Sequence, residues 1–156
     1  YVFKDNNLPL LLNIIYHLVA ARTLLSKPQG AVVRYTVQPH INPAIAASNG
    51  RRILPQTSSA IQTIDAYRAI GATHLAFATL AALALKERRI ASERLALVVL
   101  SVTSMGQTAS HAYAYWRSQQ QYTLKALQEI GGLDACITVI TAIALSNTVS
   151  RTGKLL

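Results

Sequence analysis

The most constraining feature of this chain is the uncharged run from Leu95 to Trp116. Its 22 residues include no Lys, Arg, Asp or Glu. An α-helix rises 1.5 Å per residue, so about 20 residues cross the hydrocarbon core of a bilayer. Ser92 precedes the run, and serine is a favourable residue at a helix N-terminus. The run therefore predicts a membrane-spanning helix over about residues 94–116.

Three further segments are apolar over a similar length. One has no charge between Asp5 and Arg22, another is uncharged from Ala69 to Leu85, and the last is apolar apart from two acids. They predict spans over about residues 8–25, 65–85 and 124–148. We expect residues 1–156 to form a single all-α domain, a polytopic membrane protein with about four transmembrane helices in an up-down bundle.

A water-soluble bundle is the alternative fold. Its helices would show a polar stripe opposite each apolar one, and the segments Leu75 to Leu85 and Leu95 to Val102 show none. Only 13% of the residues are charged, about half the share in soluble domains. Lipid as the surrounding solvent accounts for both observations.

Residues 26–62 separate the first two apolar segments. They contain Pro28, Gly30, Pro39, Pro43, Gly50 and Pro55, which interrupt long helices. We expect a long irregular loop with room for short interfacial helices, and an extended conformation for AVVRYTV, Ala31 to Val37.

Basic residues outnumber acidic ones, with 15 Lys and Arg against 6 Asp and Glu. The bases stand singly or in short groups at the ends of apolar segments, which argues against nucleic acid as a partner and for membrane lipids. Bound lipid is therefore expected. Their numbers on the two sides of the predicted bundle are nearly equal, so the orientation stays open.

Aromatic side chains gather at one predicted interface. Amphipathic rings prefer the level of the lipid headgroups, and four spans bring the ends of segments one and three to the same side as the starts of segments two and four. The interface residues expected there are Tyr67, Tyr113, Tyr115, Trp116 and Arg117, accompanied by Tyr16 and Tyr122. This sorting supports up-and-down spans.

Three histidines share one predicted depth. His17, His74 and His111 lie five or six residues inward from Arg22, Arg68 and Arg117, about 8 to 9 Å along a helix. Ionisable groups inside a membrane are costly unless paired, and they usually mark a site. We expect a buried polar network at this level that also includes Arg68, Gln107, Glu129 and Asp134.

The polar layer admits several functions. His74 and His111, with His17 nearby, could ligate haem iron or chlorophyll magnesium. The same histidines with Asp134 or Glu129 could serve proton transfer or a quinone. The structural alternative, which we favour, is a hydrogen-bonded layer that fixes helix register, for instance through an Arg68 to Glu129 pair.

The remaining motifs suggest no soluble-type enzyme. The sequence has no nucleophile elbow, Walker-type glycine loop, HExxH or CxxC. The single cysteine, Cys136, lies in an apolar run and is expected to be a buried, inert thiol.

The segment DAYRAIGATHLAFATLAALAL, Asp65 to Leu85, resembles the second helix of small four-helix membrane proteins of the DoxX-like type. The likeness consists of the spaced residues Asp65, Arg68 and Gly71 and a lone glutamate, Glu129, on a later helix. It extends to the layout of the apolar segments, whereas the loop 26–62 departs from it. The resemblance implies a four-helix membrane fold and no particular activity.

Together these features lead us to expect an accessory subunit of a multisubunit organellar complex, favouring the mitochondrial inner membrane over the thylakoid. The chain is small and basic and opens on Tyr1, as a processed precursor or an incomplete sequence would. One alternative is a cofactor-binding subunit, with haem or chlorophyll, in a respiratory or thylakoid electron-transport complex. Another is a small membrane enzyme that acts on a lipid or quinone.

Overall fold

A computed structural model describes residues 5–36 and 58–155 of the chain. Its elements in order are α1 (Asn7–Ser26), α2 (Pro28–Tyr35), α4 (Ser58–Glu87), α5 (Ile90–Arg117), the 3-10 turn η1 (Gln119–Gln121), α6 (Leu124–Ala126), the π-helical segment η2 (Leu127–Gly132) and α7 (Leu133–Thr152). Within these ranges the only strand-like pairing is an isolated bridge between Thr36 and Tyr122. The all-α prediction is confirmed.

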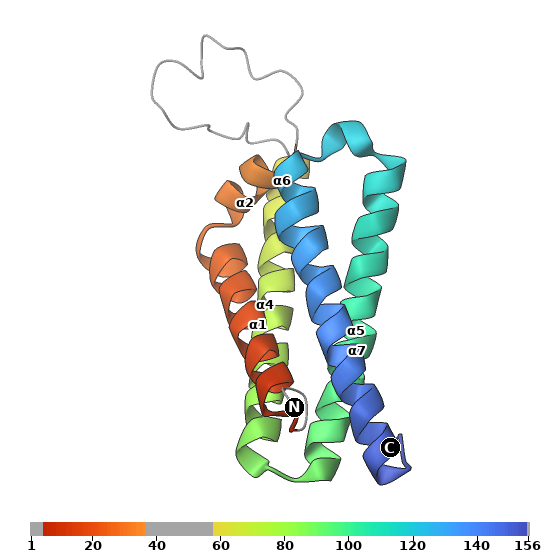
Figure 1. The fold of residues 1–156 in the computed structure, drawn as a ribbon. Coiled ribbons are helices and arrows are strands. Elements are labelled where there is room, and N and C mark those ends of the chain that lie inside the picture. Colours follow the sequence, from red (N-terminus) through yellow and green to blue (C-terminus); the bar gives the residue numbers. More distant parts are fainter. Residues whose placement is uncertain (1–4, 37–57, 156) are drawn as a thin grey trace.

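The long helices α1, α4, α5 and α7 lie side by side and alternate in direction (Figure 1). α1 packs most extensively against α4, and α5 against α7. The start of α1, the turn between α4 and α5, and the end of α7 meet at one end of the molecule, while α2 and α6 lie at the other (Figure 1). The described chain thus consists of two packed helix pairs with α2 across one end.

Three helical stretches are long and apolar enough to cross a membrane: Asn7–Ser26, Ile61–Glu87 and Leu124–Thr152. These three helices indicate that the chain is an integral membrane protein. Helix α5 has 28 residues, but serines, threonines and other polar residues lower its hydropathy below that of the other three. The predicted span over about residues 94–116 stays a prediction.

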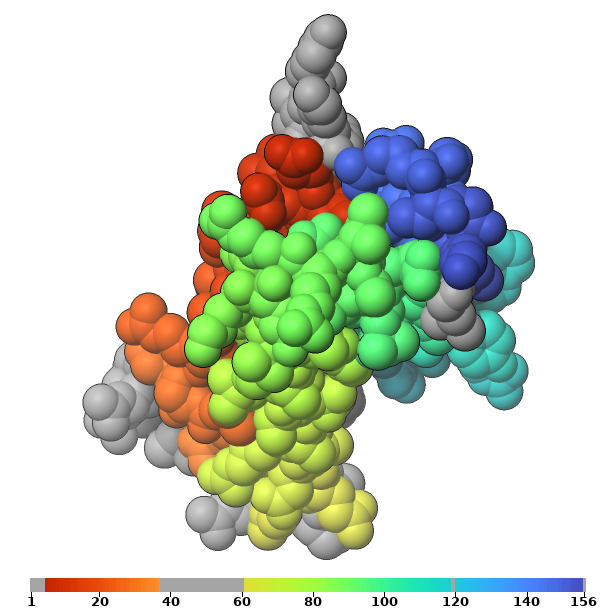
Figure 2. Space-filling view, turned by 90° about the horizontal axis from the view of Figure 1, so that it is seen from below, coloured from red at the N-terminus to blue at the C-terminus, as the bar shows by residue number. Residues whose placement is uncertain are grey.

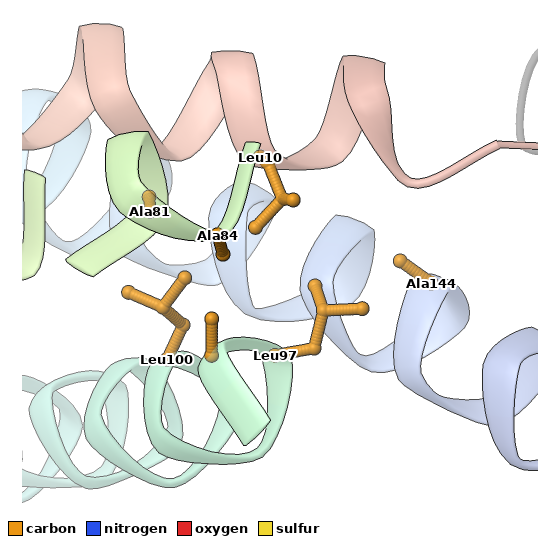
Figure 3. Packing of buried hydrophobic residues seen from close by; sticks show 7 residues of the cluster. Leu10, Ala81, Ala84, Leu97, Leu100 and Ala144 are labelled. Carbon is orange, nitrogen blue, oxygen red and sulfur yellow. The ribbon is translucent and has the colours of Figure 1, made fainter. Parts of the chain in front are cut away.

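Small side chains, chiefly alanines, make up much of the interior of the helix assembly, whereas many large apolar side chains lie on its outside. Leu10, Leu97 and Leu100 are fully buried against alanines of α4, α5 and α7 (Figure 3). Val19 of α1, Leu83 of α4 and Val139 of α7 are instead more than half exposed. Because small residues let helix backbones approach closely while lipid covers large apolar side chains, this distribution is the one expected in a bilayer.

The predicted loop over residues 26–62 is wrong in part. Pro28 opens helix α2, where its missing N–H costs nothing and its fixed φ favours a first turn. Ala31 to Tyr35 are therefore helical rather than extended. Residues 37–57, with most of the predicted loop, lie outside the described residues.

Two helices begin earlier than their apolar segments. α4 begins at Ser58 and α5 at Ile90, so each continues beyond the residues that lipid would cover. The turn between them is made by Arg88 and Arg89, and Arg88 adopts φ of 52°, a left-handed conformation. The hydrophobic pattern locates a span but not the polar turns of helix that extend it.

The prediction that Cys136 is buried is wrong. On α7 the inward positions are Asp134, Ile137, Thr141, Ala144 and Thr148, which follow the helical period. Cys136 falls between them and is exposed on the outer face. An apolar run by itself does not show which of its residues faces the neighbouring helices.

Candidate functional site

His17 of α1 and His74 of α4 meet in the interior. Their Nδ1 atoms lie 2.8 Å apart, and the two side chains are 1% and 5% exposed. One ring therefore donates its Nδ1 hydrogen to the bare Nδ1 of the other. A metal bound between the two nitrogens would need them about 4 Å apart, at roughly 2 Å per bond, so these two atoms are paired with each other rather than through an ion.

Close packing of α1 on α4 makes this contact possible. Gly71 lies about one turn from His74, and a Cβ placed there would lie 3.0 Å from the Leu24 Cβ and 3.0 Å from the Leu25 Cγ. Glycine thus removes the atom that would hold the two helices apart. Tyr16 and Phe77 complete an aromatic wall, with ring centres 5.0 Å and 5.4 Å from that of His17.

A second pair joins α5 to α7. The His111 Nδ1 lies 2.7 Å from the Asp134 Oδ2, and the Asp134 side chain is 1% exposed, whereas that of His111 is 42% exposed. The approach is close but misaligned, since neither Asp134 oxygen nor the His111 Nδ1 takes part in a directed hydrogen bond. The pair is a close polar contact with unused hydrogen-bonding capacity.

Further unpaired acceptors and donors lie near these pairs. Gln107 lies one turn from His111 on α5, and its Oε1 is buried with no hydrogen-bond partner in the described residues. The Nε2 of His17 is likewise buried without a partner there. Of the predicted layer, the structure thus brings His17 to His74 and His111 to Asp134, and Gln107 lies one helical turn from His111. The described residues hold no group of three or more His, Cys, Asp or Glu side chains arranged for a metal ion, and a haem or chlorophyll site stays a prediction.

The prediction that Arg68 pairs with Glu129 in a buried network is wrong. Arg68 binds Asp65 on its own helix at 3.0 Å, and the Arg68 side chain is 56% exposed. Glu129 instead receives a two-pronged ion pair from Arg34, with Nε 2.7 Å from Oε2, and a hydrogen bond from the Tyr35 hydroxyl at 3.2 Å. Helix α2, which lies where the sequence predicted an extended segment, brings these two residues to Glu129.

The Arg34–Glu129 pair docks α2 onto the start of the last helix. The Thr123 hydroxyl donates to the Arg34 carbonyl at 2.7 Å, and the Thr123 N–H donates to the Tyr35 carbonyl at 3.1 Å. The pKa of Tyr35 is raised, first by burial of the phenol and then by the negative charge of Glu129. Glu129 thus holds the end of the molecule together instead of joining the interior histidines.

Sequence reasoning missed two polar layers. The Asn13 amide donates to the Thr141 hydroxyl at 3.0 Å, and both side chains are fully buried. Nearer the chain termini, Asn6 donates to Glu93 at 2.8 Å and accepts from Thr148 at 2.9 Å. The sequence signal that could have predicted these contacts is an asparagine inside an apolar segment, together with two threonines seven residues apart on one face of the last helix.

The predicted interface residues lie toward one end of the helices. Tyr113 and Trp116 are 64% and 85% exposed at the end of α5, and Tyr67 is partly buried in the first half of α4. Arg117 is exposed and Tyr115 is half-buried. Tyr16 departs from this group, because it packs on the histidine pair.

A small polar pocket occupies the opposite end. Figure 2 looks onto that end, where the start of α1, the α4–α5 turn and the end of α7 come together. The pocket holds about 270 Å³ and is lined by both charges: Asp5, Asn6, Asn7, Arg88, Ile90, Glu93 and Arg151. Its acids and bases balance one another, which leaves no net preference for an anion or a cation.

Comparisons with protein-family models, with curated proteins and with solved structures find no match for this chain. The DoxX-like resemblance therefore stays a prediction.

Proposed function

We propose that the chain is a four-span integral membrane protein in which α5 is the third span. The uncharged stretch of α5 is 22 residues long and is bounded by Arg94 and Arg117. A two-residue turn joins α5 to α4, whose apolar part is itself long enough to span. If α4 crosses the bilayer, α5 has to return through it or lie across its surface, and its packing against α7 favours return.

Cysteine accessibility tests this topology. In a Cys136→Ser background, Arg89→Cys and Ser118→Cys are introduced one at a time at the two ends of α5. The proposed topology puts these two positions on opposite sides of a sealed vesicle. We expect a membrane-impermeant maleimide to label one position only. Equal labelling of both positions from one side, with full labelling of each after detergent, contradicts α5 as a membrane span.

We further propose that the protein is an accessory subunit of a multisubunit organellar complex, with the mitochondrial inner membrane as its favoured location. One observation carries this proposal: α5 presents a continuous outer face with no partner in the described chain. Its members are Val102, Met105, Gly106, Ala109, Tyr113 and Trp116. A Cβ built on Gly106 meets nothing within 4 Å.

The shape of this α5 outer face suits another membrane helix. Gly106 and Ala109 are small at its middle, and larger side chains flank them at 59% to 85% exposure. In lipid, helices associate where small residues allow close contact, since apolar side chains gain nothing by leaving hydrocarbon. We infer that the occupant is an apolar helix of a neighbouring subunit.

Co-purification in mild detergent tests the subunit role. Ala109→Leu should fill the α5 outer face and reduce recovery of the complex at least severalfold, because a branched side chain blocks close helix approach. Ala142→Leu is the matched control, since Ala142 is an exposed alanine on α7 away from this face. A wild-type chain that purifies alone from its native membrane would refute the role, and fractionation of the source cells would test the organelle.

A further inference from the structure

We propose that Asp134, His111 and Gln107 form a site within the membrane for the hydroxyl group of a lipid-soluble alcohol. The proposal rests on the membrane placement described above, but not on the partner subunit. It assigns a ligand class to side chains that the packing of the helices leaves unsatisfied. We call this group the α5–α7 acceptor site.

The first step is the state of Asp134. Its side chain is 1% exposed, yet neither oxygen accepts a directed hydrogen bond from the described residues. The one close polar atom is the His111 Nδ1, 2.7 Å from Oδ2. A buried carboxyl group without such bonds is costly in any interior and more costly where lipid excludes water.

The second step concerns the kind of partner that the unpaired atoms of the acceptor site require. Gln107 Oε1 is also buried and unpaired, so three oxygen atoms of the acceptor site, two of Asp134 and one of Gln107, lack a donor, whereas His111 Nδ1 is the one buried, unpaired nitrogen among these three residues in the described chain. The Thr138 hydroxyl, one turn along α7 from Asp134, is already engaged: it lies 2.7 Å from the Asp134 carbonyl and 3.0 Å from Thr108 Oγ1. The absent partner is therefore a hydrogen-bond donor rather than an acceptor.

The third step is access and depth. The His111 side chain is 42% exposed although its partner is buried, so His111 is the member of the acceptor site that a molecule outside the helices can contact. His111 lies six residues inward from Arg117, about 9 Å along the helix. A charged headgroup stays at the level of Arg117, whereas a single hydroxyl on an apolar body can lie at this depth.

Membrane molecules differ in whether their polar group can donate a hydrogen bond. An alcohol can donate its hydrogen to an Asp134 oxygen and can accept one from the Gln107 amide or the His111 ring. A quinone carbonyl or an ether can only accept, and would leave the surplus of acceptors uncorrected. The hydroxyl donor is thus the recognised group, whatever apolar skeleton carries it.

The test uses the full chain in lipid nanodiscs and two probes. One is a long-chain alcohol with a photoreactive diazirine close to the hydroxyl, and the other is its methyl ether. We expect the alcohol to label peptides of α5 and α7 around this site about tenfold more than the ether, as one additional hydrogen bond allows. Asp134→Asn, which keeps the shape and adds a donor, should abolish the preference, whereas Glu129→Gln, a carboxylate of the same chain outside the site, should keep it.

Equal labelling by alcohol and ether in the wild-type chain overturns the proposal. That comparison needs no variant, so it decides the question even if Asp134→Asn does not fold. A preference that survives Asp134→Asn also overturns it, because the hydroxyl would then be recognised elsewhere. Neither result touches the vesicle labelling of α5 or the co-purification of partners, so failure of this site is distinguishable from failure of the proposed function.

Discussion

Asn13 on the first helix donates its amide to the hydroxyl of Thr141 on the last, across 3.0 Å and 128 positions of sequence. The same Asn13 nitrogen donates to the Pro9 carbonyl at 2.9 Å, and Thr141 donates to the Ile137 carbonyl at 2.7 Å. The contact links the α1–α4 pair to the α5–α7 pair at a point where both side chains are fully buried.

Thr141→Val removes this link while keeping the side-chain shape. We expect it to lower the free energy of unfolding by about 0.6 to 1.7 kcal/mol, the range for hydrogen bonds between membrane helices. Thr79→Val is the control, because the Thr79 hydroxyl is exposed and binds only the carbonyl of Leu75 on its own helix. Steric-trapping measurements in bicelles would report both, and equal effects would deny the link a role.

The two histidines that touch should be energetically coupled. His74→Leu leaves the His17 Nδ1 buried without a partner, which costs about 1 to 3 kcal/mol, whereas replacing both leaves no unpaired group at this contact. We therefore expect the double variant His17→Leu/His74→Leu to lose less stability than the two single losses added. A double-mutant cycle would show a coupling of roughly 0.5 to 3 kcal/mol, and strict additivity would contradict the contact.

Two glycines should respond to the same substitution in opposite ways. Gly71→Ala forces a methyl group against Leu24 and Leu25 at 3.0 Å, so we expect a loss of about 1 to 3 kcal/mol from overpacking. Gly106→Ala meets open space and gains helix propensity, so the isolated chain should be unchanged or more stable. Thermal unfolding of the two variants in one detergent compares them, and similar losses would contradict the packing.

The docking of α2 should depend on the protonation state of Tyr35. Its pKa is raised by burial and by the charge of Glu129, so the neutral phenol stabilises docking at pH values below its unfolded pKa of about 10. This contribution is lost as pH rises through the folded pKa. Glu129→Gln removes the negative charge beside the Tyr35 hydroxyl and leaves burial as the main cause of the raised pKa, so we expect the titration midpoint of Tyr35 to fall.

Tyrosine-selective ¹³C NMR would follow that titration, with Tyr35→Phe identifying the resonance. Asp65→Asn is a matched control, since Asp65 pairs with Arg68 on its own helix. An unmoved midpoint in Glu129→Gln, or an equal shift in Asp65→Asn, would contradict the docking contact.

The sequence by itself predicted the long apolar helices, and it predicted a common depth for three histidines. Long runs without charge impose helical spans, because lipid offers no hydrogen bonds to the backbone. Counting 1.5 Å per residue from the flanking bases also put His17, His74 and His111 at one predicted depth. Both results depend only on distance along one helix.

Only the tertiary structure decided which side chains meet. His17 pairs with His74 because Gly71 lets α1 approach α4, and His111 is left to Asp134 because α5 packs on α7. Arg34 reaches Glu129 through a short helix that the prolines concealed, and Cys136 faces outward by its rotation about α7. Neighbour choice and rotation about the helix axis arise from packing between distant segments, and no count along a single segment contains them.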